Sequence, residues 1–82
     1  PEHHIRWINL YFQPDEEKTT YEVGSFEFTA HGETSSDEED GPVYAAPVVT
    51  VRMKINKPGG LLATAYCNIH GLWENTAELG LL

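Results

Sequence analysis

VTVRMKIN (Val49–Asn56) is the stretch with the clearest structural pattern in the chain. Every second side chain is apolar and the side chains between them are polar, which is the period of a strand with one buried face. Such alternation is typical of an antiparallel sheet that is open to solvent on one side. We therefore predict a strand over Val43–Lys57, a turn at Pro58–Gly60, and a returning hairpin strand over Leu61–Tyr66.

The remainder of the chain also favours strands over helices. Two segments are rich in β-branched and aromatic residues, which fit a pleated surface: His4–Phe12 and Thr19–Ala30. Trp73–Leu82 is predicted as the last strand, and the acidic run Asp37–Asp40 as part of a hydrated loop. About five strands with short connections predict an all-β fold, an antiparallel β-sandwich.

Length and composition restrict the function further. The chain has 82 residues, so we expect a single domain over residues 1–82. A formal net charge of −8 argues against binding to nucleic acid or to anionic membrane surfaces. One cysteine allows no internal disulfide and suits a reducing compartment, so we expect a cytoplasmic protein. The chain starts at Pro1 and enters a strand-like segment almost at once, so we expect further residues upstream.

The pair Cys67 and His70 is the strongest candidate for chemistry. A predicted strand ends at Cys67, and a short loop can turn both side chains toward one point. Thiolate and imidazole together suit iron, copper or zinc. The alternative is that Cys67 is a small buried apolar residue and His70 a surface histidine. A cysteine nucleophile with His70 as its base is less favoured, because cysteine hydrolases bring the base from a distant part of the chain.

The other histidines are weaker candidates. His3 and His4 are adjacent at the start of a predicted strand, where successive side chains point to opposite faces, so at most one should reach a given site. His31 is expected to be an ordinary loop histidine.

Three segments carry a resemblance to a known family. Tyr66–Glu74 (YCNIHGLWE) resembles the C-terminal iron-ligand motif of superoxide reductases, the neelaredoxin and desulfoferrodoxin family. Glu2–Ile8 is similar to the Glu-His-His-Ile segment of the family, and Phe26–Gly32 to its middle strand. The three matches occur in family order over nearly the whole chain.

The resemblance implies an immunoglobulin-like β-sandwich with one mononuclear non-haem iron. It implies that Cys67 is the axial ligand, that His3 and His70 are equatorial ligands, and that His4 points away from the metal. Two further equatorial histidines of the family lie upstream of the segment that matches Glu2–Ile8, outside this sequence.

The activity that the resemblance implies is one-electron reduction of superoxide to hydrogen peroxide. Cys67 and His70 would be the catalytic residues, a rubredoxin-like protein the electron donor, and the protein a homo-oligomer, either a dimer or a tetramer. Two alternatives stay open: a cupredoxin-like copper electron carrier, and an inactive fragment with an incomplete metal site. The copper interpretation is the weaker, because the only methionine, Met53, precedes Cys67.

Overall fold

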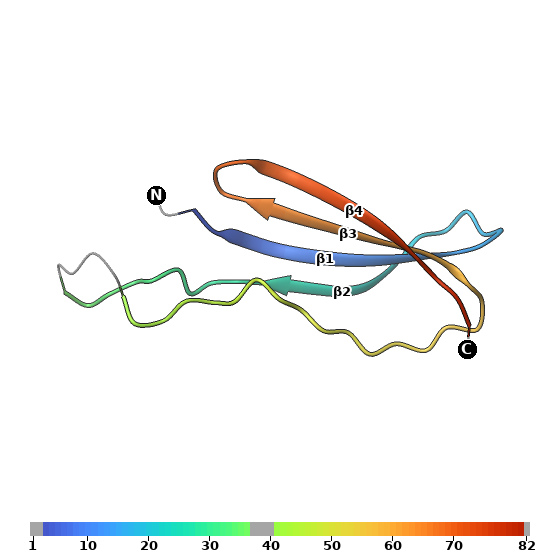
Figure 1. The fold of residues 1–82 in the computed structure, drawn as a ribbon, viewed down its shortest axis with the longest axis horizontal. Helices are drawn as coiled ribbons and strands as arrows, with labels where there is room; N and C mark the ends of the chain where they lie inside the picture. The colour runs from blue at the N-terminus through green and yellow to red at the C-terminus, as the bar shows by residue number, and fades with distance from the viewer. Residues whose placement is uncertain (1–2, 37–40, 82) are drawn as a thin grey trace.

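The computed structural model describes residues 3–36 and 41–81, and within these ranges every regular element is a strand. Four strands form one antiparallel sheet in the order β2-β1-β3-β4 (Figure 1). The predicted all-β, antiparallel fold class is therefore confirmed. No helix in the described part of the chain is long and apolar enough to cross a membrane. The strands are β1 (Ile5–Pro14), β2 (Tyr21–Glu27), β3 (Gly59–Cys67) and β4 (Gly71–Leu79).

The two central strands, β1 and β3, set the register of the sheet. β1 pairs with β2 on one side and with β3 on the other, and β3 pairs with β4 through a short hairpin. Two irregularities interrupt the ladders of β1. One leaves Val23 of β2 without a partner in β1, next to Gly24. The other leaves Arg6 without a partner in β3, between Ile5 and Trp7, while its carbonyl accepts from the Phe28 N–H at 2.8 Å. A bulge of this kind changes the direction of the strand that carries it.

The segment Val43–Lys57 differs from its prediction. It is extended, but it forms no ladder, and its one bridge pairs Tyr44 with His31. The predicted hairpin with Leu61–Tyr66 is therefore wrong, and the structure has four regular strands in its described ranges instead of about five. The physical reason is that β3 pairs along both of its edges, with β1 and β4, so it has no edge left for a third partner.

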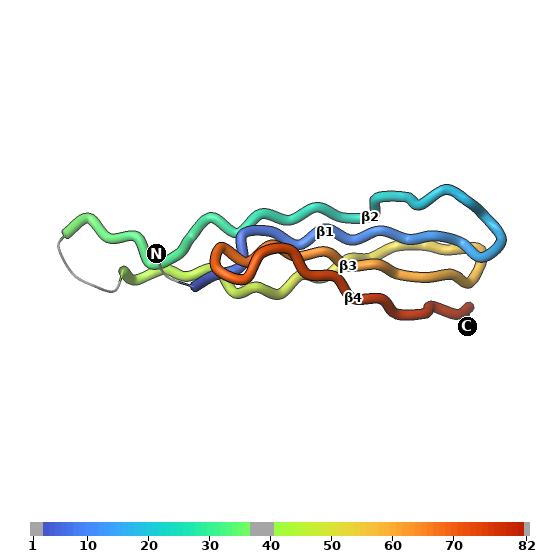
Figure 2. The backbone as a smooth tube through the Cα atoms, turned by 90° about the horizontal axis from the view of Figure 1, so that it is seen from above, coloured from blue at the N-terminus to red at the C-terminus, as the bar shows by residue number. Residues whose placement is uncertain are grey.

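This extended segment nevertheless covers part of the sheet. The segment begins beside the residues that follow β2, where Tyr44 pairs with His31, and Figures 1 and 2, taken together, show its continuation toward β3 running across one face of the sheet. Its apolar side chains lie near β1 and β2: Met53 and Ile55 line one cavity with Phe12 and Val23, and a Cβ built on Gly24 would lie 3.1 Å from the Val51 side chain. Along this segment Val49, Val51 and Ile55 are half-buried, whereas the polar side chains between them are exposed. The alternation therefore identified the more buried side of the segment, although it did not identify a pairing partner. The acidic run Asp37–Asp40 lies outside the described residues.

The core is small. Among the described residues, only two apolar side chains are buried, Phe12 at 5% exposure and Cys67 at 2%. Phe12 lies near the end of β1, and Cys67 is the last residue of β3. β4 is an edge strand, and its Leu72 and Trp73 remain largely exposed. Cys67 is thus one of the best protected positions in a thin structure, and it lies beside the first residue of β1.

Candidate metal centre

The β3–β4 hairpin presents the Cys-x-x-His motif. Cys67 pairs with Gly71, so the loop consists of the three residues Asn68–His70. Gly71 has a φ of 80°, in the left-handed region where a three-residue hairpin loop commonly needs glycine. A Cβ built on Gly71 would meet no atom within 4 Å. Glycine at this position is therefore required by the backbone conformation and not by a neighbouring side chain.

Across this hairpin, Cys67 and His70 face each other. The Cys67 Sγ lies 3.7 Å from His70 Nδ1, and the backbone N–H of His70 donates to the same sulfur at 3.3 Å. Donation from a backbone N–H stabilises negative charge on sulfur, and such contacts tune a metal held by a thiolate. The thiol is buried while the His70 ring is exposed, so the pair has one protected and one accessible side.

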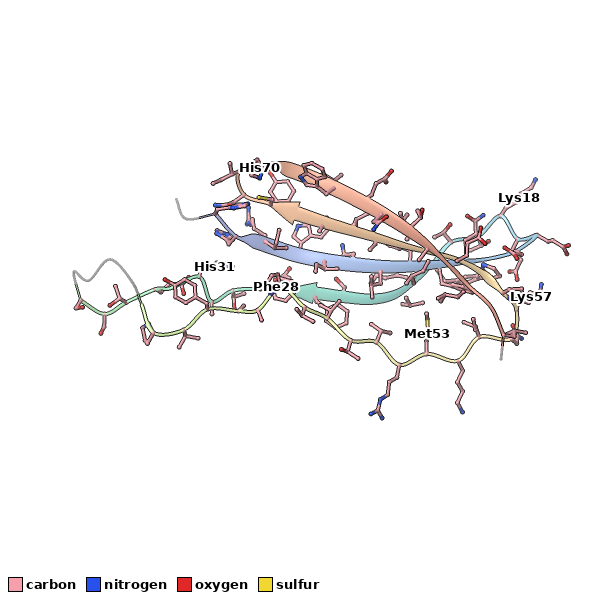
Figure 3. All side chains as sticks on the ribbon, in the orientation of Figure 1. Lys18, Phe28, His31, Met53, Lys57 and His70 are labelled. Carbon is pink, nitrogen blue, oxygen red and sulfur yellow. The ribbon has the colours of Figure 1, made fainter. Side chains whose placement is uncertain are left out.

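His3 completes a cluster of three donors. Its ring contacts that of His70 edge-on, with the ring centroids 4.8 Å apart. One ligand atom from each of His3, Cys67 and His70 lies within 4.8 Å of the other two. Figure 3 shows His70 at the end of the sheet where β1 begins and β3 ends, far from Lys18 and Lys57 at the opposite end. The topology thus brings together residues from both ends of the chain.

The cluster fits a metal ion in donor type and in size. Ligand atoms that bind one ion at about 2.0–2.3 Å can lie at most about 4.5 Å apart. The 3.7 Å between Cys67 Sγ and His70 Nδ1 is well inside that limit. The outer limit of 4.8 Å for the three atoms is slightly longer, and rotation of an exposed imidazole can close the difference. Two imidazoles and a thiolate suit iron, copper or zinc.

The remaining histidines form a separate pair. The His4 ring stacks on the ring of His31, with centroids 3.6 Å apart and an interplanar angle of 22°. His4 is therefore directed away from the cluster, as the resemblance implies, and His31 is more than the ordinary loop histidine that we expected. Both line a cavity of about 260 Å³ together with Tyr44 and Pro47. Sequence reasoning missed the stack because 27 positions separate the two rings (31 − 4).

One charged group beside this pair is perturbed. The backbone N–H of His31 donates to both carboxylate oxygens of Glu33, at 3.1 and 2.9 Å. Chiefly because of this bond, the pKa of Glu33 is lowered. The carboxylate thus anchors the chain where His31 stacks on His4.

Fold and site together define a small antiparallel β domain with a candidate centre of two histidines and one cysteine. Residues 1–76 match the desulfoferrodoxin family, and the chain belongs to this family.

Named relatives agree with that assignment. The chain is 56% identical to neelaredoxin from Megalodesulfovibrio gigas over 98% of its own length and 62% of that protein. It is 51% identical to superoxide reductase from Pyrococcus furiosus, over 95% of this chain and 63% of the relative. The solved superoxide reductase (neelaredoxin) from Archaeoglobus fulgidus in the reduced form matches with a TM-score of 0.90. That match has 48% identity and covers 96% of this chain and 64% of that chain. The chain therefore spans less than two thirds of each of these relatives.

Proposed function

We propose that this chain is the metal-binding domain of a superoxide reductase. The observation that carries the proposal is the convergence of His3, Cys67 and His70 within 4.8 Å. This cluster lies in a chain that belongs to the desulfoferrodoxin family. The proposed reaction takes one superoxide ion, one electron and two protons to one molecule of hydrogen peroxide. Relatives named superoxide reductase or neelaredoxin support this choice of reaction.

In this proposal residues 1–82 form one domain, in which His3, Cys67 and His70 bind a single non-haem iron. Bound iron would supply the single electron that superoxide accepts. Cys67 supplies a thiolate from the protected side, and the His70 N–H donates to that thiolate. His3 and His70 are exposed, so the imidazole side is the accessible one for a small anion. Cys67 and His70 are the residues that we assign to catalysis.

Several features of the proposal concern partners. A rubredoxin-like protein would return one electron after each turnover, which makes the reaction a reduction and not a dismutation. A homo-oligomeric, cytoplasmic protein is part of the same proposal. The formal net charge of −8 does not attract a superoxide anion, so the positive charge of the metal centre would have to do so.

The copper alternative has a weaker structural basis. Blue-copper sites use two histidines and a cysteine, usually with a distant axial methionine. Met53, the only methionine, lies on the segment that crosses the sheet and lines a cavity with Phe12 and Val23. Figure 3 shows Met53 well away from His70. A copper site here would therefore lack the methionine that is typical of this class.

The experiment is metal analysis of the purified protein, combined with a superoxide consumption assay in the presence of a reductant. We expect iron close to one per chain, and loss of activity by about 100-fold or more in Cys67→Ser, because the substitution removes a ligand. Ala63→Ser is the control, since it adds the same hydroxyl to β3 away from the site. Stoichiometric copper would favour the electron carrier, and absence of metal would favour an incomplete site. Unchanged turnover in Cys67→Ser would refute the role of the thiolate.

A further inference from the structure

Two reciprocal hydrogen bonds join the segments that carry the three cluster residues. The backbone N–H of His4 donates to the side-chain Oδ1 of Asn68 at 2.9 Å. The backbone N–H of Asn68 donates to the carbonyl of His4 at 3.2 Å. We call this pair the His4–Asn68 clamp. Its two residues are 64 positions apart in sequence, so it is a tertiary contact and not part of a local turn.

The clamp continues the β1–β3 ladder beyond its last regular pair. Ile5 pairs with Cys67, so His4 and Asn68 would form the next antiparallel pair. The chain, however, enters the hairpin turn at Asn68. The side-chain carbonyl of Asn68 then takes the acceptor position that a strand backbone would otherwise supply. Asparagine is suited to this because its side-chain amide resembles a peptide group.

Each residue of the clamp is the direct neighbour of a cluster residue. His4 follows His3, and Asn68 follows Cys67. The hairpin holds Cys67 and His70 against each other without outside help, through the contact of the His70 N–H with the sulfur. His3, in contrast, is exposed and precedes the first residue of β1, so it lies outside the regular β1–β3 ladder. The clamp holds the residue that directly follows His3, and the ring of that residue also stacks on the His31 ring.

We propose that Asn68 is a positioning residue for the metal centre: it holds His3 in place against the Cys67–His70 pair. This inference depends on the metal site proposed above, and it adds a residue that binds no metal itself. Its effect should fall on His3 specifically, because Cys67 and His70 belong to one hairpin and are joined by the bond from the His70 N–H to the sulfur. Removing the clamp should therefore lower the metal affinity as much as removing the His3 imidazole does.

The test uses Co²⁺ as the probe, with affinity measured by chelator competition and with the thiolate-to-metal absorption band recorded. Asn68→Ala should weaken Co²⁺ binding by roughly 10- to 100-fold, the usual effect of losing an outer-shell partner. The thiolate band should persist. Asn68→Asp keeps the acceptor oxygen and should restore most of the affinity. Asn75→Ala is the matched control, because it also loses a 2.9 Å side-chain-to-backbone hydrogen bond but lies in β4, away from the site.

A double-mutant cycle separates positioning from general destabilisation. In a His3→Ala background, Asn68→Ala should weaken Co²⁺ binding by less than about 2-fold further, because residues that act as a unit are not additive. Full additivity, or unchanged affinity in Asn68→Ala alone, would overturn the positioning role while leaving the metal site intact. Failure of the unmodified protein to bind Co²⁺ would overturn the site and the positioning role together.

Hydrogen exchange of the metal-free protein gives a readout that is independent of metal and of activity. The His4 amide should exchange slowly in the unmodified protein and in Asn68→Asp, and quickly in Asn68→Ala. Circular dichroism of the same samples checks that the sheet is retained. Equal exchange rates at His4 in all three proteins would show that the clamp does not hold this segment.

Discussion

Gly59 should tolerate no side chain, whereas its neighbour Gly60 should accept one. A Cβ at Gly59 would lie against the carbonyl oxygen of Gln13 and 2.8 Å from both the Phe12 ring and the Pro14 Cα. These neighbours are mostly backbone or core atoms, so they cannot move aside as an exposed side chain could. A Cβ at Gly60 would meet no atom within 4 Å. The two glycines are adjacent in β3 and have opposite environments.

The size of the effect follows from what fixes Gly59. It pairs with Pro14 on one side and with Leu79 on the other, and the Asp15 N–H donates to the Pro58 carbonyl at 2.9 Å. Overpacking usually costs about 1–3 kcal/mol, and we expect about 2.5 kcal/mol, in the upper part of that range, because the strand is held on both edges. Gly60→Ala should gain about 0.5 kcal/mol by restricting the unfolded chain. The two variants should therefore differ by about 3 kcal/mol.

Urea and thermal unfolding, followed by fluorescence of Trp7 and Trp73, provide the assay, since these residues lie in β1 and β4. For a domain of this length, about 3 kcal/mol corresponds to a difference of roughly 12–24 °C in melting temperature. Free energies of unfolding within about 0.5 kcal/mol of each other for the two variants would contradict the close approach of β1 and β3 at Gly59.

Two further predictions concern the hairpin and the acidic side chain beside the histidine stack. Gly71→Ala should lower the free energy of unfolding by about 1–2 kcal/mol, because its φ of 80° strains an L-residue; Gly80→Ala, with no positive φ, should be nearly neutral in the same urea titration. The pKa of Glu33 is lowered in the folded protein, chiefly by the hydrogen bond from the His31 N–H. The ionised Glu33 carboxylate therefore stabilises the fold at neutral pH, and this stabilisation is lost as the pH falls through the folded-state pKa. NMR titration of the Glu33 carboxyl should show this lowered pKa, and Glu33→Gln should abolish that part of the acid dependence; an ordinary pKa would mean that the hydrogen bond does not persist in solution.

The sequence predicted the strands of the sheet better than it predicted their partners. His4–Phe12 and Leu61–Tyr66 lie within or close to β1 and β3, because their residue types favour a pleated conformation whatever their neighbours. Val43–Lys57 shows the limit of this reasoning. An alternation with a period of two shows which side chains share a face. Pairing depends instead on whether the neighbouring strand has a free edge, and both edges of β3 are already paired.

The candidate site was predictable to different degrees for its different parts. Cys67 and His70 are three residues apart, so local spacing was enough to suggest that they meet. His3 could be added only through the family resemblance, because no local pattern links it to a loop at the other end of the chain. Asn68 was not singled out at all. Its role depends on His4, and polar residues in hairpin loops are too common to attract notice by themselves.

The distance in sequence between His3 and Cys67 has a consequence for folding. An ion bound by both residues would cross-link the chain across 64 positions (67 − 3). In the chain-entropy description of cross-links, a closed loop of that length removes about 4 kcal/mol of disorder from the unfolded state. The chain contains a single cysteine and cannot form an internal disulfide. In so thin a sheet, the bound metal would therefore also act as a cross-link that stabilises the fold, a role that disulfide bonds play in many small domains.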